Sequence, residues 1–435
     1  MEATSNWKYA QHWKAPFFTI WTGQAFSLLG SMLVSFTLIW WLTKTTGSAT
    51  VLATASLAAL LPQVLLGPIT GTLVDRWNRR LVMILADSAI ALATLLLAFL
   101  FLTGRVQIWQ VYVLMAIRSI GSGFHWPAMT ASTSLMVPSQ HLARIQGMNQ
   151  MLQGAMNIVS APLGALLLEW LPIQAILMID VSTAIIAVAP LLFIPVPQPV
   201  RIAADGSSQA GSSFWKEFVE GFRYAFSWPG LVMIGIMAAL INLLLSPGIS
   251  LLPILVTQHF NGQAFQLAWV ESAMGLGIVI GGLLLSIWGG FKRRILTTLV
   301  GLFGLGLGCL GLGMVPAGAF SLAVALLFWL GFVNPITNGP LMAAVQAVVA
   351  PDMQGRVFTL IGSVASAMTP LGLIIAGPVA DRFGVQIWFV LGGIITLVMA
   401  TASLFIPAVM NFEQGRKIAT PATDTEAAPS PTPAD

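Results

Sequence analysis

The stretch GTLVDRWNRR, residues 71–80, places charged side chains at four of its ten positions: Asp75, Arg76, Arg79 and Arg80. Only 8% of the 435-residue chain is charged, and long apolar runs lie on both sides of this stretch. Arginines gathered in a short connection between two apolar segments are typical of a loop at a membrane surface. The stretch therefore predicts a tight bend between two membrane spans.

The composition of the whole chain excludes an ordinary soluble protein. Hydrophobic residues make up 57% of it and the mean hydropathy is +0.87, whereas soluble domains carry about 25% charged residues. The apolar runs are about 20 residues long, the length of a helical span, and do not alternate as barrel strands do. We predict an all-α membrane protein without a cleavable signal peptide, because the first apolar run is too long for one.

Two further classes are excluded by single counts. The one cysteine, Cys309, rules out a disulfide within the chain and a cysteine-based metal site. The net charge of +4 does not predict nucleic-acid binding, because the basic residues lie in short loops beside the spans.

The apolar runs predict twelve transmembrane helices joined by short bends, so that consecutive helices are antiparallel neighbours. They are expected at about residues 16–43, 51–74, 81–103, 107–133, 146–169, 173–194, 230–257, 265–290, 295–315, 318–348, 357–380 and 385–409.

One long connection, residues 195–229, divides the spans six plus six. We therefore expect an N-terminal six-helix bundle at 1–194, a cytoplasmic linker at 195–229, a C-terminal bundle at 230–410 and a disordered cytoplasmic tail at 411–435. The linker contains FWKEFVEGFRYAF (214–226), whose phenylalanines share one face. This pattern predicts an amphipathic helix, either on the membrane surface or solvated.

The distribution of lysine and arginine predicts the orientation. With both termini in the cytoplasm, fifteen of the 19 basic residues lie on that side, Lys44, Arg105 and Arg382 lie on the other, and Arg118 lies inside a span. This bias follows the positive-inside rule. We expect a multi-pass protein of a bacterial inner membrane.

Spans five and eleven look like copies of each other. Glu169 follows Arg144 by 25 residues, and Asp381 follows Arg356 by the same distance, each through glycines and a proline. The repeat relates the two halves of the chain and predicts two pseudo-symmetric six-helix bundles.

A second repeat lies within the first half. Asp75 is followed by Asp87 after 12 residues, and Glu169 by Asp180 after 11. Spans two and five end on opposite sides, so this repeat is inverted in the membrane. Inverted three-helix repeats within each half are typical of secondary transporters that bind substrate near the bilayer midplane.

These motifs resemble the major facilitator superfamily over nearly the whole chain. GTLVDRWNRR is similar to its loop motif between spans two and three, and LMAIRSIGSGFHWPA (114–128) to its fourth-span motif with an intramembrane arginine. APLGA (161–165) is a looser match to the fifth-span antiporter motif, with Ala161 where glycine is expected. WTGQAFSLLGS, WWLTKTTGSAT and LPQVLLGP resemble the macrolide-efflux branch of drug:proton antiporters. The resemblance implies secondary active export.

Gly67, Gly71 and Asp75 are spaced by four, so they share one helical face that suits close helix packing. The resemblance implies that Asp75 meets the N-terminus of span eleven when the cytoplasmic side is closed, beside Arg356. A loop that only sets topology is the alternative. The predicted cytoplasmic gate comprises Gly67, Gly71, Asp75, Arg76, Arg79, Arg80 and Arg356. In the matching loop of the second half, Ser286 replaces the acid, so the gate is asymmetric. On the outer side we expect a periplasmic gate of Glu169, Asp381 and Arg382.

Charged residues inside the spans are costly and are usually paired or functional. Asp87 and Asp180 each lie about 10 Å into the membrane, and Arg118 lies near the middle of span four. We expect Asp87 or Asp180, with Arg118, to couple protons to transport; a structural ion pair is the alternative. Glu271 is a third candidate, with an interfacial role as its alternative.

Polar stripes at helical spacing mark the first span of each three-helix repeat and also span five. Facing inward, they would line an aqueous path whose aromatic neighbours make it amphiphilic. A single aromatic at such a position is more often packing than ligand contact, and His125 could titrate near neutral pH or be a hydrogen-bonded structural histidine. The predicted cavity residues are Gln24, Ser27, Ser31, Ser122, His125, Asn149, Gln153, Asn157, Asn242, Asn334 and Asn338.

We therefore predict a monomeric exporter of amphiphilic organic compounds, of macrolide or multidrug type, that exchanges them for protons across the lipid bilayer. No cofactor is expected, and no Gly-x-x-x-x-Gly-Lys-Ser/Thr phosphate loop occurs. An enzyme is not expected, since no nucleophile–base or metal constellation appears. Transport of a siderophore, a lysolipid or another metabolite is one alternative. A membrane sensor without transport is another, although the linker and tail are too short for a folded output module.

Overall fold

The computed structural model describes residues 12–198, 222–223 and 226–414. Twelve helices of 20 residues or more lie in these ranges, and 20 residues rise about 30 Å, the thickness of a bilayer's hydrocarbon core. Their bounds are α1 (Lys14–Thr46), α2 (Ala49–Arg76), α3 (Arg79–Leu102), α4 (Ile108–Met136), α5 (Ser139–Trp170), α6 (Ile173–Phe193), α8 (Pro229–Ser250), α10 (Ala264–Trp288), α11 (Arg294–Met314), α12 (Phe320–Val348), α13 (Pro351–Phe383) and α14 (Gln386–Phe405). The predicted all-helical membrane fold is confirmed.

Eleven of these helices are long and apolar enough to cross a membrane, and α4 is the exception among the described helices. The α4 helix is 29 residues long, so its length suffices. Its composition differs because Arg118, Ser122 and His125 follow one another along it. A helix with this much polar surface must turn that surface away from lipid.

The seventh predicted span, 230–257, lies within a helical segment that runs from Pro229 to His259, but this segment is not one continuous helix. The α8 helix ends at Ser250, and a short helix α9 (Leu252–Ile254) and a π-helical turn η2 (Leu255–His259) follow. Pro253 lies in the first turn of α9, the place where a proline's missing N–H costs least. Pro247, by contrast, lies inside α8.

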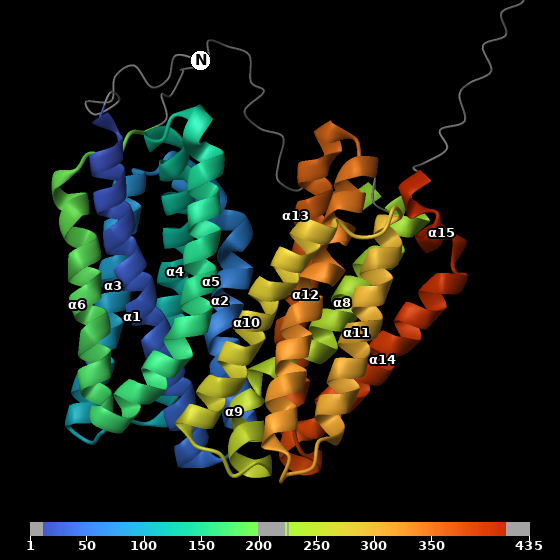
Figure 1. Cartoon of the computed structure of the whole chain (residues 1–435). Coiled ribbons are helices and arrows are strands. Elements are labelled where there is room, and N and C mark those ends of the chain that lie inside the picture. Colours follow the sequence, from blue (N-terminus) through green and yellow to red (C-terminus); the bar gives the residue numbers. More distant parts are fainter. Residues whose placement is uncertain (1–11, 199–221, 224–225, 415–435) are drawn as a thin grey trace, which may run out of the picture.

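Figure 1 shows the helices in two groups, α1–α6 and α8–α15, that stand side by side. Within the first group α1 packs on α5 and α6, and α4 packs on α2 and α3; within the second, α12 packs on α10 and α11, and α8 packs on α13 and α14. The main contacts between the groups are α2 with α13 and α5 with α10. We call the side where α1 begins and α14 ends the terminal side, and the other the opposite side.

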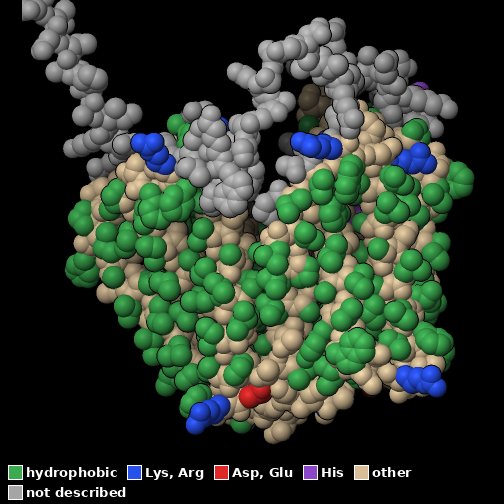
Figure 2. All heavy atoms as spheres, turned by 180° about the vertical axis from the view of Figure 1, so that it is seen from behind, with side chains coloured by type: hydrophobic (Ala, Val, Ile, Leu, Met, Phe, Trp, Pro, Cys, Tyr) green, Lys and Arg blue, Asp and Glu red, His purple; other side chains and the backbone are tan. Residues whose placement is uncertain are grey.

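The flank of the molecule is covered by hydrophobic side chains. Figure 2 shows them spread over the height of one face, with lysine and arginine side chains near its two ends. Leu96, Ile185 and Ile287 are among the large apolar side chains that are exposed in the described structure. Such a surface suits lipid and not water, so the chain is a multi-pass membrane protein.

The ordered C-terminal group continues a few residues past the predicted boundary at 410. After α15 (Pro407–Met410) comes a 3₁₀ turn, η3 (Phe412–Gln414). Phe412 is buried and stacks on Trp228, with ring centroids 5.1 Å apart. The Glu413 carboxylate accepts a hydrogen bond of 2.7 Å from the backbone N–H of Ile295, at the start of α11. Most of the predicted linker helix and the predicted tail from 415 onward lie outside the described residues.

Candidate functional site

A cavity of about 530 Å³ lies among α1–α5, a size typical of small-molecule sites. Seven of the predicted cavity residues line it: Gln24, Ser27, Ser31, Ser122, His125, Asn149 and Gln153. The side chains of Trp21 and Trp126 add aromatic surface, and Trp21 Nε1 donates a 2.7 Å hydrogen bond to Asn149 Oδ1. The cavity is therefore amphiphilic, with amide, hydroxyl and indole groups in one wall.

A second cavity, of about 550 Å³, extends the first toward the terminal side. The two share Trp126, Thr130, Thr133 and Gln146. The second also reaches Gly71, near the C-terminal end of α2. Together they make a path from the middle of the bundle to the terminal side.

Asp87 lies in the wall of the first cavity and is 4% exposed. One carboxylate oxygen, Oδ2, accepts a 3.0 Å hydrogen bond from Gln24 Nε2 of α1. The other, Oδ1, faces His125 Nε2 of α4 at 3.5 Å. That distance suits an ion pair if the imidazole is protonated, but His125 Nε2 makes no hydrogen bond within the described residues.

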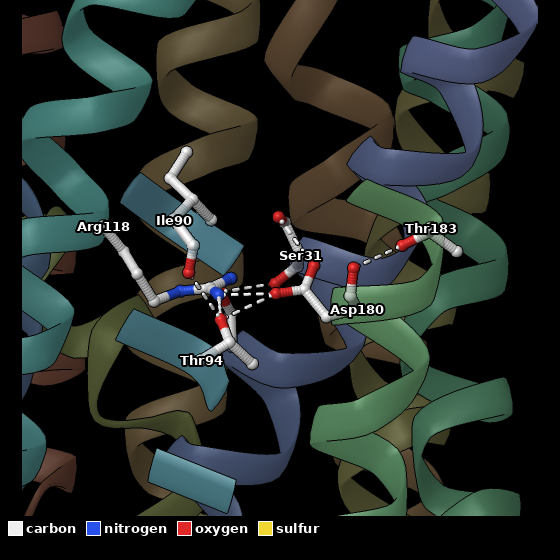
Figure 3. Close-up of polar contacts among 7 residues, drawn as sticks. Ser31, Ile90, Thr94, Arg118, Asp180 and Thr183 are labelled. Carbon is white, nitrogen blue, oxygen red and sulfur yellow. Dashed lines mark hydrogen bonds and ion pairs between the residues drawn. The ribbon is translucent and has the colours of Figure 1, made fainter. Parts of the chain in front are cut away.

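Asp180 and Arg118 form a buried ion pair between α6 and α4. Arg118 Nη1 lies 2.6 Å from Asp180 Oδ2, and the Asp180 side chain is 1% exposed. Thr94 Oγ1 donates to the same oxygen at 2.9 Å and accepts from Arg118 Nη1, while Ser31 Oγ donates to Oδ1 at 3.1 Å. Figure 3 shows these side chains converging from four helices. Both carboxylate oxygens are thus satisfied, which a buried charge requires.

Gly30 lets α1 approach α6 closely enough to build this network. A Cβ on Gly30 would lie 2.3 Å from Thr183 Oγ1 and 3.0 Å from the Asp180 Cα. Thr183 Oγ1 in turn donates to the Asp180 backbone carbonyl. The missing side chain therefore places Ser31, the next residue of α1, within reach of the Asp180 carboxylate.

The remaining predicted polar residues line neither of the two cavities. Asn242 Nδ2 and Asn338 Nδ2 each donate to a backbone carbonyl one turn earlier in their own helix, and Asn334 is exposed. Asn157 is exposed, on α5. Glu271 is half-buried on α10, one residue before Ser272, whose hydroxyl donates to the Ile158 carbonyl of α5. The structure thus does not bring Glu271 to Asp87, Asp180 and Arg118.

On the opposite side, Asp381 connects the two groups of helices. Its carboxylate accepts from the backbone N–H of Ala49 at 2.6 Å, from the N–H of Thr50 at 3.0 Å and from Ser48 Oγ at 3.0 Å. These donors form the N-terminus of α2, where unpaired amides and the helix dipole favour an anion. We call this contact the opposite-side clamp.

The other two predicted residues of this gate lie outside the clamp. Glu169 is exposed at the end of α5. Arg382 is exposed, and its guanidinium lies over the Phe383 ring, 5.6 Å from the centroid. Gly377, one turn before Asp381, is where the two helices touch: a Cβ there would lie 2.6 Å from the Thr50 Cα.

On the terminal side the corresponding glycines are not in contact. A Cβ added to Gly67 or Gly71 of α2 would have no neighbouring heavy atom within 4 Å, and the same holds for Gly355 and Gly362 of α13. The α2 and α13 helices therefore touch at the opposite side and leave space at the terminal side. The side chain of Asp75 lies outside the described residues.

Two arginines of the opening motif fasten the loop to other helices of the first group. Arg80 donates to the carbonyls of Leu191 and Leu192 at the end of α6, where a cation also suits the helix dipole. Arg79 Nη1 donates to the Ala131 carbonyl of α4 at 2.9 Å. Arg76 is exposed, and Arg356 Nη1 lies 3.7 Å from Met353 Sδ. Arg79 and Arg80 therefore bind neighbouring helices, in addition to lying in a basic loop that the sequence predicts to set the membrane orientation.

Sequence reasoning missed Thr94, the hydroxyl between Arg118 and Asp180. It follows Asp87 by seven residues, two helical turns, and so shares its face. That spacing was a usable signal. It also missed Gln63, Gln146 and Gln150 of the cavity wall.

Comparison with known proteins agrees with this architecture. The family profile of the Major Facilitator Superfamily matches residues 20–373. Macrolide efflux protein A of Streptococcus pyogenes is 36% identical over 389 residues, which cover 89% of this chain and 95% of that protein. The multidrug efflux pump Tap of Mycolicibacterium fortuitum is 27% identical over 390 residues, covering 87% and 92%.

Solved structures with the same arrangement of helices include the nucleoside transporter NupG. It aligns with a TM-score of 0.67 at 15% identity, covering 90% of this chain and 98% of that one. A bacterial homologue of the human lysosomal transporter Spinster, solved in an inward-facing and unoccupied conformation, aligns with a TM-score of 0.67 at 14% identity, covering 92% and 97%. At these identities the likeness concerns the fold alone.

Proposed function

From the premise that this chain belongs to the major facilitator superfamily, we propose that it exports amphiphilic organic compounds, of macrolide or multidrug type, in exchange for protons. The observation that carries the proposal is the cavity of about 530 Å³ in the first group of helices. Its wall combines indole and aliphatic surface with amides and one carboxylate, which suits a compound with an apolar body and a polar end. The names of its efflux relatives point to the same class of compound.

The proposed export uses alternating access. The clamp at Asp381 and the contact at Gly377 hold α2 and α13 together on the opposite side, while Gly71 and Gly362 leave space on the terminal side. We assign this structure to the state that loads substrate from the terminal side. In the other state the Asp75 carboxylate binds the N-terminus of α13, as the Asp381 carboxylate binds that of α2 in this structure. The opposite side is then open.

The terminal side is assigned to the cytoplasm of a bacterial cell. The topology read from the sequence assigns fifteen of the 19 lysines and arginines to the cytoplasm, in accord with the positive-inside rule. Substrate then enters from the cytoplasm and leaves outward. Reporter fusions at both termini that are active only in the cytoplasm test this assignment; an active outward-facing reporter at either end contradicts it.

Protons are coupled through Asp87 or Asp180 with Arg118. Asp87 faces the cavity and has one carboxylate oxygen without a hydrogen bond in the described structure, whereas both oxygens of Asp180 are engaged. A proton moving down a potential of 100 mV supplies about 2.3 kcal/mol, enough for more than a tenfold gradient of an exported neutral compound.

The test is the accumulation of a radiolabelled macrolide in cells with and without the protein. We expect lower accumulation in expressing cells and loss of the difference when a protonophore collapses the gradient. Asp87→Asn and Asp180→Asn separate the two carboxylates, and surface expression of each variant is the control. Full proton-driven export in both variants would remove the coupling assignment, and equal accumulation with and without the protein would remove macrolide export.

A further inference from the structure

One face of α5 carries a row of carboxamide side chains along the first cavity. Its members are Gln146, Asn149, Gln150 and Gln153, and each of them lines that cavity. Positions that follow Gln146 by three, four and seven residues lie on the same side of a helix. Since a helix rises about 1.5 Å per residue, the row extends over about 10 Å. We call these four side chains the amide row; it begins at Gln146, where the two cavities meet.

The amide row is uncharged and mostly without partners in the protein. The side chains of Gln146, Gln150 and Gln153 form no hydrogen bond with another residue in the described ranges. A carboxamide offers two N–H donors and one carbonyl acceptor, which water can satisfy in the absence of a substrate. A substrate that displaces this water must replace its hydrogen bonds, or the amides are left unpaired at a cost in affinity. The row therefore favours a substrate with several hydrogen-bonding groups along one edge.

Two carboxamides of the cavity wall are held in a defined orientation. The indole of Trp21 can only donate, and its Nε1 donates to Asn149 Oδ1 at 2.7 Å. The Nδ2 donors of Asn149 are therefore left for a ligand. On α1, Gln24 Nε2 donates to Asp87 Oδ2 at 3.0 Å, which leaves Gln24 Oε1 as an acceptor. The wall thus offers an oriented donor and an oriented acceptor, and hydroxyl groups suit both because they accept and donate.

We propose that the amide row and Gln24 are the specificity-determining residues of the first cavity, and that they bind hydroxyl groups spread over about 10 Å of the substrate. This inference rests on the proposed function and names within it the substrate class: amphiphiles whose polar part is a set of hydroxyl groups, as in a glycoside. Selection is by hydrogen bonds and not by charge. The apolar body of the substrate lies against side chains such as Leu28, Ile90 and Met129, which line the same cavity.

The experiment compares two neutral probes on the purified full-length protein in lipid nanodiscs. One probe is 2-naphthyl β-D-glucoside, and the other is the tetrahydropyranyl ether of 2-naphthol, which has the same ring skeleton without the hydroxyl groups. Calorimetry measures both affinities, and protein-free nanodiscs supply the blank for partition into lipid. We expect the glucoside to bind at least about tenfold more tightly, because the ether leaves the amides unpaired.

Variants of the amide row locate the effect. Gln150→Met and Gln153→Met remove an amide at nearly constant side-chain volume. Each should weaken binding of the glucoside by about tenfold and leave that of the ether equal or stronger. The matched control is Gln140→Met, which changes a glutamine of the same helix that lines neither cavity; it should bind both probes as the wild type does. Thermal unfolding of each variant checks that it is folded.

Three outcomes would overturn the assignment. They are equal binding of the two probes by the wild type, binding of neither probe, and an unchanged preference for the glucoside in a folded Gln150→Met/Gln153→Met variant. The first two need no variant, so the test holds even if a substitution prevents folding.

These outcomes are distinct from failure of the proposed function. Each can occur while macrolide accumulation in cells still depends on the protein and on the proton gradient. If cells show no macrolide export but the purified protein prefers the glucoside through Gln150 and Gln153, only the proposed macrolide export fails.

Discussion

Asp381 caps the helix that begins at Ala49, 332 residues earlier in the chain, through a 2.6 Å hydrogen bond from the Ala49 N–H to its carboxylate. The contact expected for Asp75 is the reverse one, in which the acid at the end of α2 meets the N-terminus of α13. Each of these acids follows a glycine by four residues at the C-terminal end of its helix, Gly71 before Asp75 in α2 and Gly377 before Asp381 in α13. Because α2 and α13 are antiparallel, each helix offers an N-terminus where the other offers a carboxylate. The proposed alternating access would have this pair of helices close at one end and then at the other.

Replacing Asp381 by Asn should shift the protein toward the state that is open on the opposite side. The amide keeps one acceptor but loses the negative charge that the α2 amides and dipole favour, a loss of about 0.5–1 kcal/mol for an exposed cap. Spin labels at the opposite-side ends of α2 and α13 should report a larger population at long distance. Glu169→Gln removes another acid of the opposite side; an equal shift in that variant would show that the clamp does not depend specifically on Asp381.

Replacing Gly377 by Val should prevent closure of the opposite side. A Cβ there would lie 2.6 Å from the Thr50 Cα and 3.2 Å from the Ala53 Cβ, and contact with backbone cannot be relieved by a side-chain rotation. We expect loss of transport, together with a wide distance distribution between spin labels at the opposite-side ends of α2 and α13. Wild-type transport by this variant would exclude the close contact from the cycle.

Replacing Gly71 by Val should leave this structure unchanged but prevent closure of the terminal side. No heavy atom lies within 4 Å of the added Cβ in this structure, so thermal stability should stay within about 0.5 kcal/mol of the wild type. Transport should nevertheless fall strongly, because closing the terminal side requires α2 and α13 to approach there. Normal stability with normal transport would show that this face never becomes an interface.

Replacing Asp180 by Asn should destabilise the fold much more than Asp87→Asn. It leaves Arg118 buried without its counter-ion, and breaking a buried pair costs about 3–5 kcal/mol. In Asp87→Asn the side-chain oxygen can still accept from Gln24, so only one charge disappears. Chemical unfolding in a fixed detergent would compare the two variants.

The double variant Asp180→Asn/Arg118→Met supplies the control for that comparison. Removing both charges should restore most of the stability lost in Asp180→Asn. If the double variant is as unstable as the single one, the loss comes from packing around Asp180 and not from the unpaired guanidinium.

The membrane spans could be predicted because a helix in lipid needs a long apolar run, which the sequence shows directly. The polar wall in α1, α4 and α5 could also be predicted, since its residues recur at helical spacing. The same reasoning placed Asn242 and Asn338 in a cavity wall, yet each bonds a carbonyl of its own helix. A polar side chain that can be satisfied locally does not require an aqueous path.

Other features depend on contacts that a sequence does not display. The partner of Asp381 is a set of backbone amides, which any residue carries, so only the approach of two distant helices reveals it. Phe412 and Glu413 read as the start of a polar tail, but their contacts to Trp228 and Ile295 hold them in place. Thr94 could have been selected by its spacing from Asp87, although threonine is common in apolar helices.

The first cavity belongs to one half of the chain, because every described residue in its wall lies between Trp21 and Gln153. Recognition and motion can therefore change independently during evolution. A chimera that joins residues 1–194 of this protein to the second half of a distant relative should inherit this protein's choice of compounds and the relative's turnover rate. Resistance arising by point mutation should accordingly broaden the range of exported compounds through α1–α5, and raise the turnover rate through α8–α14.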